Sequence, residues 1–146
     1  MQQRLDFYKA SPDAIKALLA LEVALGKRGL DTTLVNLVKL RASQINGCAY
    51  CVDTHTSDAR KAGEAERRLY AVSVWRETPF FTPRERAALA WTESLTCLAQ
   101  THAADSDYEL LQAQFNEVER VDLTLVIGAI NIWNRLGVGF RKTPAA

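Results

Sequence analysis

The chain has 146 residues, with 18 basic and 17 acidic side chains that leave a formal net charge of +1. A chain of this length buries enough surface for one hydrophobic core, so we predict a single domain over residues 1–146. Charges of both signs are mixed along the sequence. No basic stripe or polybasic patch indicates a nucleic acid or a membrane as partner, which leaves small molecules and other protein chains.

The N-terminus is charged at Arg4 and lacks the apolar stretch of a secretory signal, so we expect a cytoplasmic protein. Three cysteines in a reducing compartment indicate redox or metal chemistry rather than structural disulfides. The apolar run at 121–133 contains Asp122 and Asn131. We therefore expect it to form a core or interface helix and not a membrane span.

Helix signals follow one another along the chain, and no strand pattern interrupts them. Ser11 is expected to cap a first helix that begins at Pro12 and ends near Gly26. Asp31 is expected to cap a second helix, over 32–45. Asparagine and glycine at 46 and 47 follow it, and both tolerate the left-handed backbone that ends helices.

The later helices are marked by polar caps with a glutamate three residues further on, which is the capping-box pattern. These boxes begin at Thr82, Ser106 and Asn116. The remaining predicted helices are the third from near Cys48 to about Ala62, the fourth over 64–77, the fifth over 84–100, a short sixth and a long seventh. We predict an all-α fold of about seven helices, in which the second and third form a hairpin with a CxxC motif.

Three reactive side chains share one face of the third predicted helix. A rotation of about 100° per residue places Cys48, Cys51 and His55 within an arc of roughly 60°. Side chains three apart come close enough for a disulfide to form in a flexible first turn. The pair is therefore expected to cycle between dithiol and disulfide.

Either sulfur is a candidate nucleophile. The positive end of the helix dipole favours the thiolate of Cys48, whereas His55 can accept the proton of Cys51 and hold it as an ion pair. In an antiparallel hairpin Asn36 lies level with positions 55–57, where it can orient the imidazole. These patterns alone leave the choice of sulfur open.

The stretches at 36–77, 82–96 and 129–136 resemble the alkyl hydroperoxidase AhpD-like branch of the carboxymuconolactone decarboxylase superfamily. The resemblance covers nearly the whole chain, and its specific part is the CxxC followed by three residues and histidine. It implies that Cys51 attacks a hydroperoxide, that Cys48 resolves the sulfenic acid, and that His55 relays protons. It also implies an antioxidant peroxidase without metal or cofactor, reset by an external dithiol, and a homo-oligomer such as a hexamer.

Two positions depart from this family. Asn36 stands where a glutamate is common, and an amide can orient an imidazole but cannot take its proton. The best-characterised relay of the family has a histidine between the cysteines. Tyr50 takes that place here, as tyrosine does in other members, and it can hydrogen-bond but is a poor base at neutral pH. We expect both changes to slow peroxide turnover.

Glu93 is a candidate for compensating these changes, because burial among apolar residues would raise the pKa of its carboxyl and suit it to proton exchange. The alternative is an ion-paired or partly exposed helix residue. A zinc site would need Cys97 or His102 as a fourth ligand beside the CxxC and His55. Cys97 is explained more simply as a core residue, and His102 as a solvated one.

Two other functions are compatible with the pattern. A lactone decarboxylase belongs to the other branch of the superfamily, but its chemistry does not require a CxxC. A redox-sensing oligomer would use the disulfide to change its assembly and would turn over no substrate.

Overall fold

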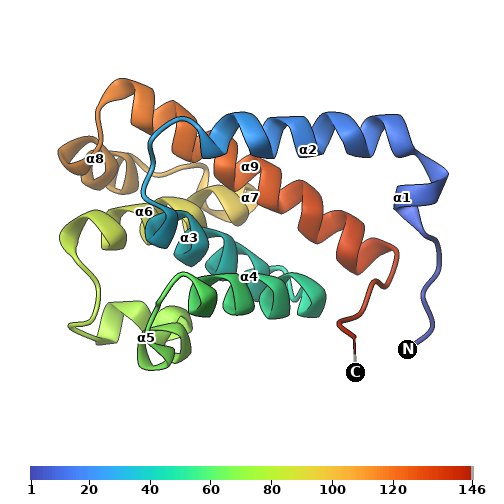
Figure 1. The fold of residues 1–146 in the computed structure, drawn as a ribbon. Helices are drawn as coiled ribbons and strands as arrows, with labels where there is room; N and C mark the ends of the chain where they lie inside the picture. Colours follow the sequence, from blue (N-terminus) through green and yellow to red (C-terminus); the bar gives the residue numbers. More distant parts are fainter. Residues whose placement is uncertain (146) are drawn as a thin grey trace.

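The computed structural model describes residues 1–145, which form nine α-helices and one 3₁₀ helix with no strand (Figure 1). The all-α prediction is therefore confirmed. The elements are α1 (Phe7–Ala10), α2 (Pro12–Gly26), α3 (Thr32–Ile45), α4 (Ala49–Lys61), α5 (Glu66–Ala71), η1 (Val72–Glu77), α6 (Pro83–Thr96), α7 (Leu98–Thr101), α8 (Asp105–Gln114) and α9 (Glu117–Gly139).

Local caps place most of the helix starts. The backbone N–H of Leu34 donates to the Asp31 carboxylate at 3.2 Å, which satisfies a free donor in the first turn of α3. Complete capping boxes begin α6 at Thr82 and α9 at Asn116. These helices begin where the sequence predicts.

Two predicted caps are wrong. Ser11 precedes Pro12, but its hydroxyl makes no capping hydrogen bond because Ser11 also ends α1, with φ −141° and ψ 66°. Helix α8 begins at Asp105 with Ala104 as its cap, so Ser106 lies inside the helix. Acidic side chains in that first turn stabilise its N-terminal end without a side-chain cap.

Two predicted helices are each divided in the structure. The fourth becomes α5 and η1, and Val74 lies in non-helical backbone with φ −123° and ψ 27°. The β-branched residues in this stretch have low helix propensity. The fifth ends at Thr96, and Cys97 with φ −98° and ψ 34° separates α6 from α7.

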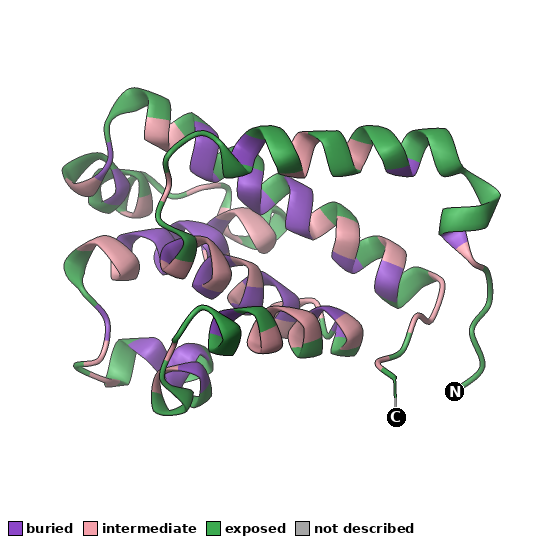
Figure 2. Ribbon diagram, viewed as in Figure 1, coloured by how far each residue is buried: buried purple, intermediate pink, exposed green. Residues whose placement is uncertain are grey.

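Helix α9 lies at the centre of the fold and contacts α2, α3, α4, α6 and α8. Buried residues gather where α3, α6 and α9 face one another (Figure 2). Val38, Ala88, Leu123 and Ile127 belong to the largest cluster, which joins these three helices. The packing of α9 therefore fixes the position of the α3–α4 hairpin.

Helix α9 is long and apolar enough to cross a membrane, but the core helices of globular proteins can have the same length and composition. In this protein 44% of the most apolar stretch of α9 is buried. Its opposite face exposes Val121, Leu125, Ile132 and Val138. An exposed apolar face of this kind suits an interface with a second copy of the chain. The homo-oligomer stays a prediction.

Helices α3 and α4 pack side by side as the predicted hairpin (Figure 1). Gly47 turns the chain with φ +65°, a conformation that costs glycine little because it has no Cβ. The two ends of the chain also meet, since the backbone N–H of Arg4 donates to the carbonyl of Phe140 at 3.0 Å. This hydrogen bond holds the start of the chain beside the C-terminal end of α9.

Candidate redox site

Cys48 and Cys51 form a disulfide at the start of α4, with their Cα atoms 5.2 Å apart. Cys48 is the N-cap of the helix, and its sulfur accepts a hydrogen bond from the backbone N–H of Cys51 at 3.3 Å. Both residues are almost completely buried, with 1% and 3% of their surfaces exposed. The predicted ability of the CxxC pair to close a disulfide is confirmed.

Gly137 of α9 lies directly against this disulfide. A Cβ atom at this position would be 2.8 Å from the sulfur of Cys48 and 3.4 Å from the sulfur of Cys51. The first distance is shorter than real Cβ contacts, so only glycine lets α9 approach the sulfurs this closely. The sequence reasoning missed this residue, although an isolated glycine inside an apolar helix is a known sign of close packing.

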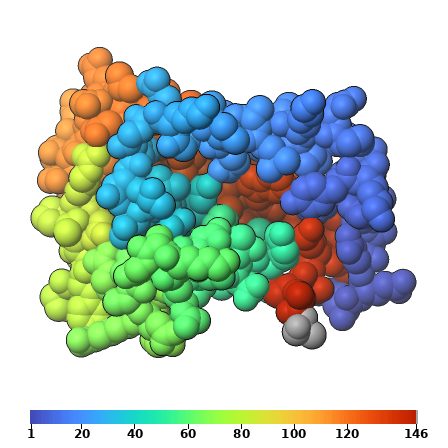
Figure 3. Space-filling view, in the orientation of Figure 1, coloured from blue at the N-terminus to red at the C-terminus, as the bar shows by residue number. Residues whose placement is uncertain are grey.

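A pocket of about 190 Å³ opens beside Cys51. It lies between α2 and α4, and Figure 3 shows this face hollowed there, with α9 in red at the floor. Cys51 lines the pocket and Cys48 does not. The other lining residues are Phe7, Tyr8, Leu19, Glu22, Lys39, Tyr50, Thr54, His55, Trp133 and Gly137.

His55 lies one turn after Cys51 on α4 and lines the same pocket. Burial and, after it, the positive charge of Lys39 lower the pKa of its imidazole, Asp58 and Glu22 oppose the shift, and the resulting pKa is about 4. The ring is therefore neutral at pH 7. A neutral imidazole next to a cysteine can accept the thiol proton.

Aromatic side chains from the N-terminal helix close one side of the pocket. Tyr8 of α1 stacks on Trp133 of α9, with the ring centroids 6.3 Å apart. Burial raises the pKa of Tyr8, and so does its contact with Tyr50. The ammonium of Lys142 lies 4.7 Å from the ring centre of Tyr50. Tyr50 thus forms part of an aromatic wall.

Asn36 does not line the pocket. Lys39, one turn nearer to the hairpin on the same helix, faces the pocket in its place. Within residues 1–145 the Asn36 amide makes no hydrogen bond to His55. The orienting role that we expected for Asn36 has no support in these contacts.

The expected raised pKa of Glu93 is wrong. Burial alone would raise it, but hydrogen bonds from Arg76, Trp75 and Arg41 outweigh burial and lower the pKa of this carboxyl. The indole of Trp75 donates at 2.9 Å and the guanidinium of Arg41 at 2.7 Å. Glu93 is also absent from the pocket beside Cys51, so it is an ion-paired structural residue.

The ligands that a zinc site would need are not brought together. Among residues 1–145, no three histidine, cysteine or acidic side chains are grouped to hold a metal ion. Cys97 is a free cysteine at the junction of α6 and α7, and His102 is exposed in left-handed backbone, with φ 52°. Neither lines the pocket of Cys51.

A buried amide network holds the hairpin turn against α9. The amide of Asn46 donates to the side-chain oxygens of Asn131 at 3.0 Å and Asn134 at 2.9 Å. Asn134 in turn donates to the hydroxyl of Ser43 at 3.0 Å, and Asn131 to that of Thr96 at 3.1 Å. These bonds fix the segment that leads directly into Cys48.

Replacing Asn134 with leucine is expected to destabilise the protein by about 1–3 kcal/mol, because it removes the buried hydrogen bonds that this amide makes with Asn46 and Ser43. Urea unfolding of the oxidised protein measures this loss. Gln112→Leu, which replaces an exposed amide of α8 outside this network, is the control and should change stability by less than about 0.5 kcal/mol. Equal losses in the two variants would contradict the role of the network.

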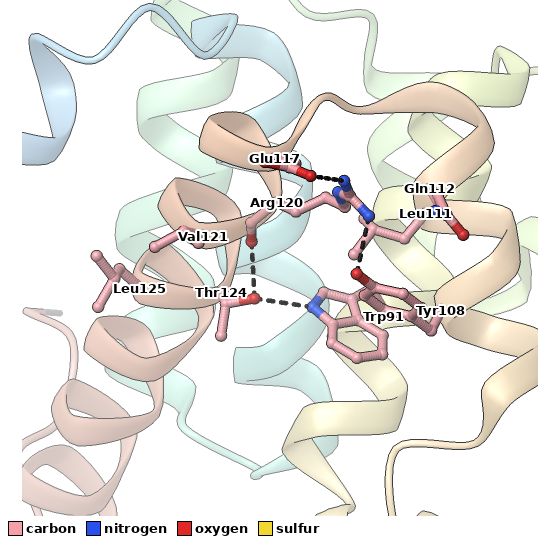
Figure 4. A pocket seen from close by; sticks show the side chains of 9 residues that line it. All are labelled: Trp91, Tyr108, Leu111, Gln112, Glu117, Arg120, Val121, Thr124 and Leu125. Carbon is pink, nitrogen blue, oxygen red and sulfur yellow. Dashed lines mark hydrogen bonds and ion pairs between the residues drawn. The ribbon is translucent and has the colours of Figure 1, made fainter.

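A larger hollow of about 460 Å³ lies between α6, α8 and α9 (Figure 4). The guanidinium of Arg120 donates to the hydroxyl of Tyr108 at 2.8 Å, and the indole of Trp91 donates to Thr124 at 3.0 Å. None of its lining residues is a cysteine or histidine. Of these two hollows, the smaller one therefore borders the disulfide.

Residues 10–94 match the family model described as the carboxymuconolactone decarboxylase family. The chain is 38% identical to the uncharacterised protein YdfG of Bacillus subtilis over 146 residues, which is 100% of this chain and 99% of that one. The chain therefore belongs to the carboxymuconolactone decarboxylase family and, within it, to the AhpD-like proteins. The predicted resemblance is confirmed.

Solved structures agree with this assignment. A protein of unknown function from Agrobacterium tumefaciens, ascribed to antioxidant defence as AhpD, is 46% identical with a TM-score of 0.96, covering 99% of this chain and 100% of that one. An uncharacterised peroxidase-related protein from Ralstonia eutropha with an AhpD core is 23% identical, with a TM-score of 0.81. Its match covers 94% of this chain and 74% of that one, and it shows the shared fold.

Proposed function

We propose that the protein is a thiol-dependent peroxidase in which Cys51 attacks a hydroperoxide and Cys48 resolves the product. The observation that carries the proposal is that Cys51 and His55 line the pocket together, whereas Cys48 lies behind them against Gly137. A substrate in the pocket meets the sulfur of Cys51 first. The antioxidant and peroxidase descriptions of the similar structures support the same chemistry.

The reaction begins from the dithiol. The thiolate of Cys51 attacks the terminal oxygen of ROOH, the O–O bond breaks, and Cys51 becomes a sulfenic acid while RO⁻ takes up a proton as ROH. The thiol of Cys48 then displaces water from the sulfenic acid and forms the disulfide. An external dithiol reduces this disulfide and is itself oxidised, which returns both cysteines to thiols.

His55 moves the proton in this cycle. Its neutral ring accepts the proton of the Cys51 thiol and gives it to RO⁻ as the O–O bond breaks. Burial and Lys39, which lower the pKa of His55, make the imidazolium a strong acid toward the leaving oxygen. A histidine in this environment is suited to transient protonation.

The pocket favours a small organic hydroperoxide over a large one. Its volume of about 190 Å³ is below the roughly 300–1,000 Å³ of sites for drug-sized ligands. Leu19, Phe7 and Trp133 give it apolar walls that stabilise an organic group R by burial. The peroxide group would then lie at the polar end, beside Cys51 and His55.

The test is hydroperoxide consumption with a dithiol as reductant. We expect Cys51→Ser to abolish turnover, and Cys48→Ser to stop after one equivalent of peroxide with a sulfenic acid on Cys51. His55→Gln should slow turnover by about 10²–10⁴-fold, because a proton shuttle is lost. Cys97→Ser is the control, since this cysteine lies outside the pocket, and it should keep full activity.

The contrary result is turnover that is equal in all four variants, or a sulfenic acid that forms on Cys48 instead of Cys51. A disulfide that opens and closes without peroxide consumption would favour the redox-sensing module.

A further inference from the structure

Glu22 of α2 carries a buried carboxylate oxygen without a partner. Its Oε2 pairs with the ammonium of Lys39 at 2.5 Å. Its Oε1 is shielded from solvent and accepts no hydrogen bond from any of residues 1–145. An unsatisfied buried acceptor on a charged group costs free energy, so such an atom in a native site needs an explanation.

This carboxylate faces the redox site. Glu22 from α2 and Lys39 from α3 line the same pocket as Cys51 and His55 from α4. The pair thus brings a negative and a positive charge from two other helices to the polar end of the pocket. Lys39 holds one carboxylate oxygen and leaves the other one free.

The charges of this pair act on the imidazole in opposite directions. Lys39 lowers the pKa of His55, and Glu22 raises it. The other titratable groups around the ring are Asp58 and Tyr50 on α4 and Tyr8 on α1. The α9 wall contributes Trp133 and Gly137, which do not titrate. Of the anions that act on His55, Glu22 is the one that lines the pocket.

We propose that Glu22 is a positioning residue that acts through His55, its free oxygen accepting a hydrogen bond from the imidazolium. This rests on the proposed function. Cys51–SH and His55 become thiolate and imidazolium, Glu22 stays ionised throughout, and the imidazolium later gives its proton to RO⁻. Glu22 thereby supplies from α2 a carboxylate like the one that the family resemblance implied at the place of Asn36.

The decisive variant is Glu22→Gln combined with Lys39→Met. Glu22→Gln alone would leave Lys39 unpaired, and that positive charge would itself stabilise the thiolate. The double variant removes both charges, so the net charge of the site is unchanged while the acceptor for the imidazolium is lost. Asp122→Asn with Arg28→Met is the matched control, because it removes another ion pair of a buried carboxylate, outside this pocket.

The first measurement is the rate at which iodoacetamide alkylates Cys51 in the reduced protein at pH 7, resolved from Cys48 and Cys97 by tandem mass spectrometry of peptides. We expect the Glu22/Lys39 variant to react about tenfold more slowly, which corresponds to about one unit in the thiol pKa. The control pair should react like the parent. Unchanged alkylation in the Glu22/Lys39 variant would overturn the proposal.

A second measurement uses the fact that the chain has two histidines. NMR titration of the oxidised single variants should show a lower pKa for His55 in Glu22→Gln and a higher one in Lys39→Met. If neither substitution moves it, the pair does not face the ring and the proposal is wrong. Neither measurement contains peroxide, so an inactive parent protein would refute the peroxidase while leaving the role of Glu22 open to this test.

Discussion

Gly137→Ala is expected to destabilise the oxidised protein by about 1–3 kcal/mol, the cost of an added methyl group in a closely packed site. The new Cβ would lie 2.8 Å from the sulfur of Cys48, so α9 or the first turn of α4 must shift. The core offers little room, because Gly137 is buried and α9 also packs against α3 and α6. Urea unfolding of the oxidised protein measures the loss.

The same substitution should slow peroxide turnover. Reduction breaks the S–S bond, and two thiols need more space than a disulfide whose sulfurs are about 2 Å apart. An added methyl group at 137 occupies the space into which the sulfur of Cys48 would move. We therefore expect the cycle of Gly137→Ala to stall at the step in which the external dithiol reduces the disulfide.

Gly128→Ala is the matched control on the same helix. Gly128 is exposed, and a Cβ there would meet no atom within 4 Å. Alanine in place of a helical glycine should stabilise the protein by up to about 1 kcal/mol. Helix propensity favours alanine at both positions, so a loss of stability at 137 with a gain at 128 would show that the methyl group at 137 crowds the disulfide. Equal changes in the free energy of unfolding would contradict the role of Gly137.

The helix starts that the sequence predicted correctly depend on local hydrogen bonds. Asp31, Thr82 and Asn116 each bond to a backbone N–H three residues later, so the pattern and the contact lie within one turn. Ser106 has the same pattern, but α8 had already begun at Asp105. A spacing rule identifies a possible cap and cannot decide between two starts that are one residue apart.

The residues of the candidate site also fall into those that the sequence predicted and those that only the structure shows. Cys48, Cys51 and His55 lie on one helix, so their shared face follows from helical periodicity. Glu22 and Gly137 reach the site from α2 and α9, and only the packing of these helices brings them there. Contacts between different helices cannot be predicted from the spacing of residues within the CxxC motif.

Glu93 was predicted as a site residue, but the structure places it outside the site. The apolar neighbours in its own helix suggested an isolated buried carboxyl, yet its partners Arg41 and Arg76 come from α3 and η1. Two guanidinium groups reverse the direction of the pKa shift that burial alone would produce. A buried ionisable group can be assigned a role only when its tertiary partners are known.

Acidification is expected to destabilise the oxidised protein through His55. Burial, and then Lys39, lower the pKa of this imidazole from 6.5 to about 4 in the folded state. Above pH 6.5 the ring is neutral in both states. Between pH 6.5 and 4 the unfolded chain binds a proton that the folded protein does not, so stability falls as the pH falls. The loss levels off below pH 4, at about 3 kcal/mol.

Urea unfolding at pH 7 and pH 4.5 tests this, and the His55 contribution should amount to about 2 kcal/mol. Carboxyl groups also titrate in this range, so the parent is compared with His55→Gln. In that variant the difference between the free energies of unfolding at pH 7 and pH 4.5 should be smaller by about 2 kcal/mol. His102→Asn is the control, because His102 is exposed and asparagine tolerates its left-handed backbone. A His55→Gln protein with the parent's full acid sensitivity would mean that the pKa of the imidazole is the same in the folded and unfolded states, which contradicts the lowered pKa of the folded protein.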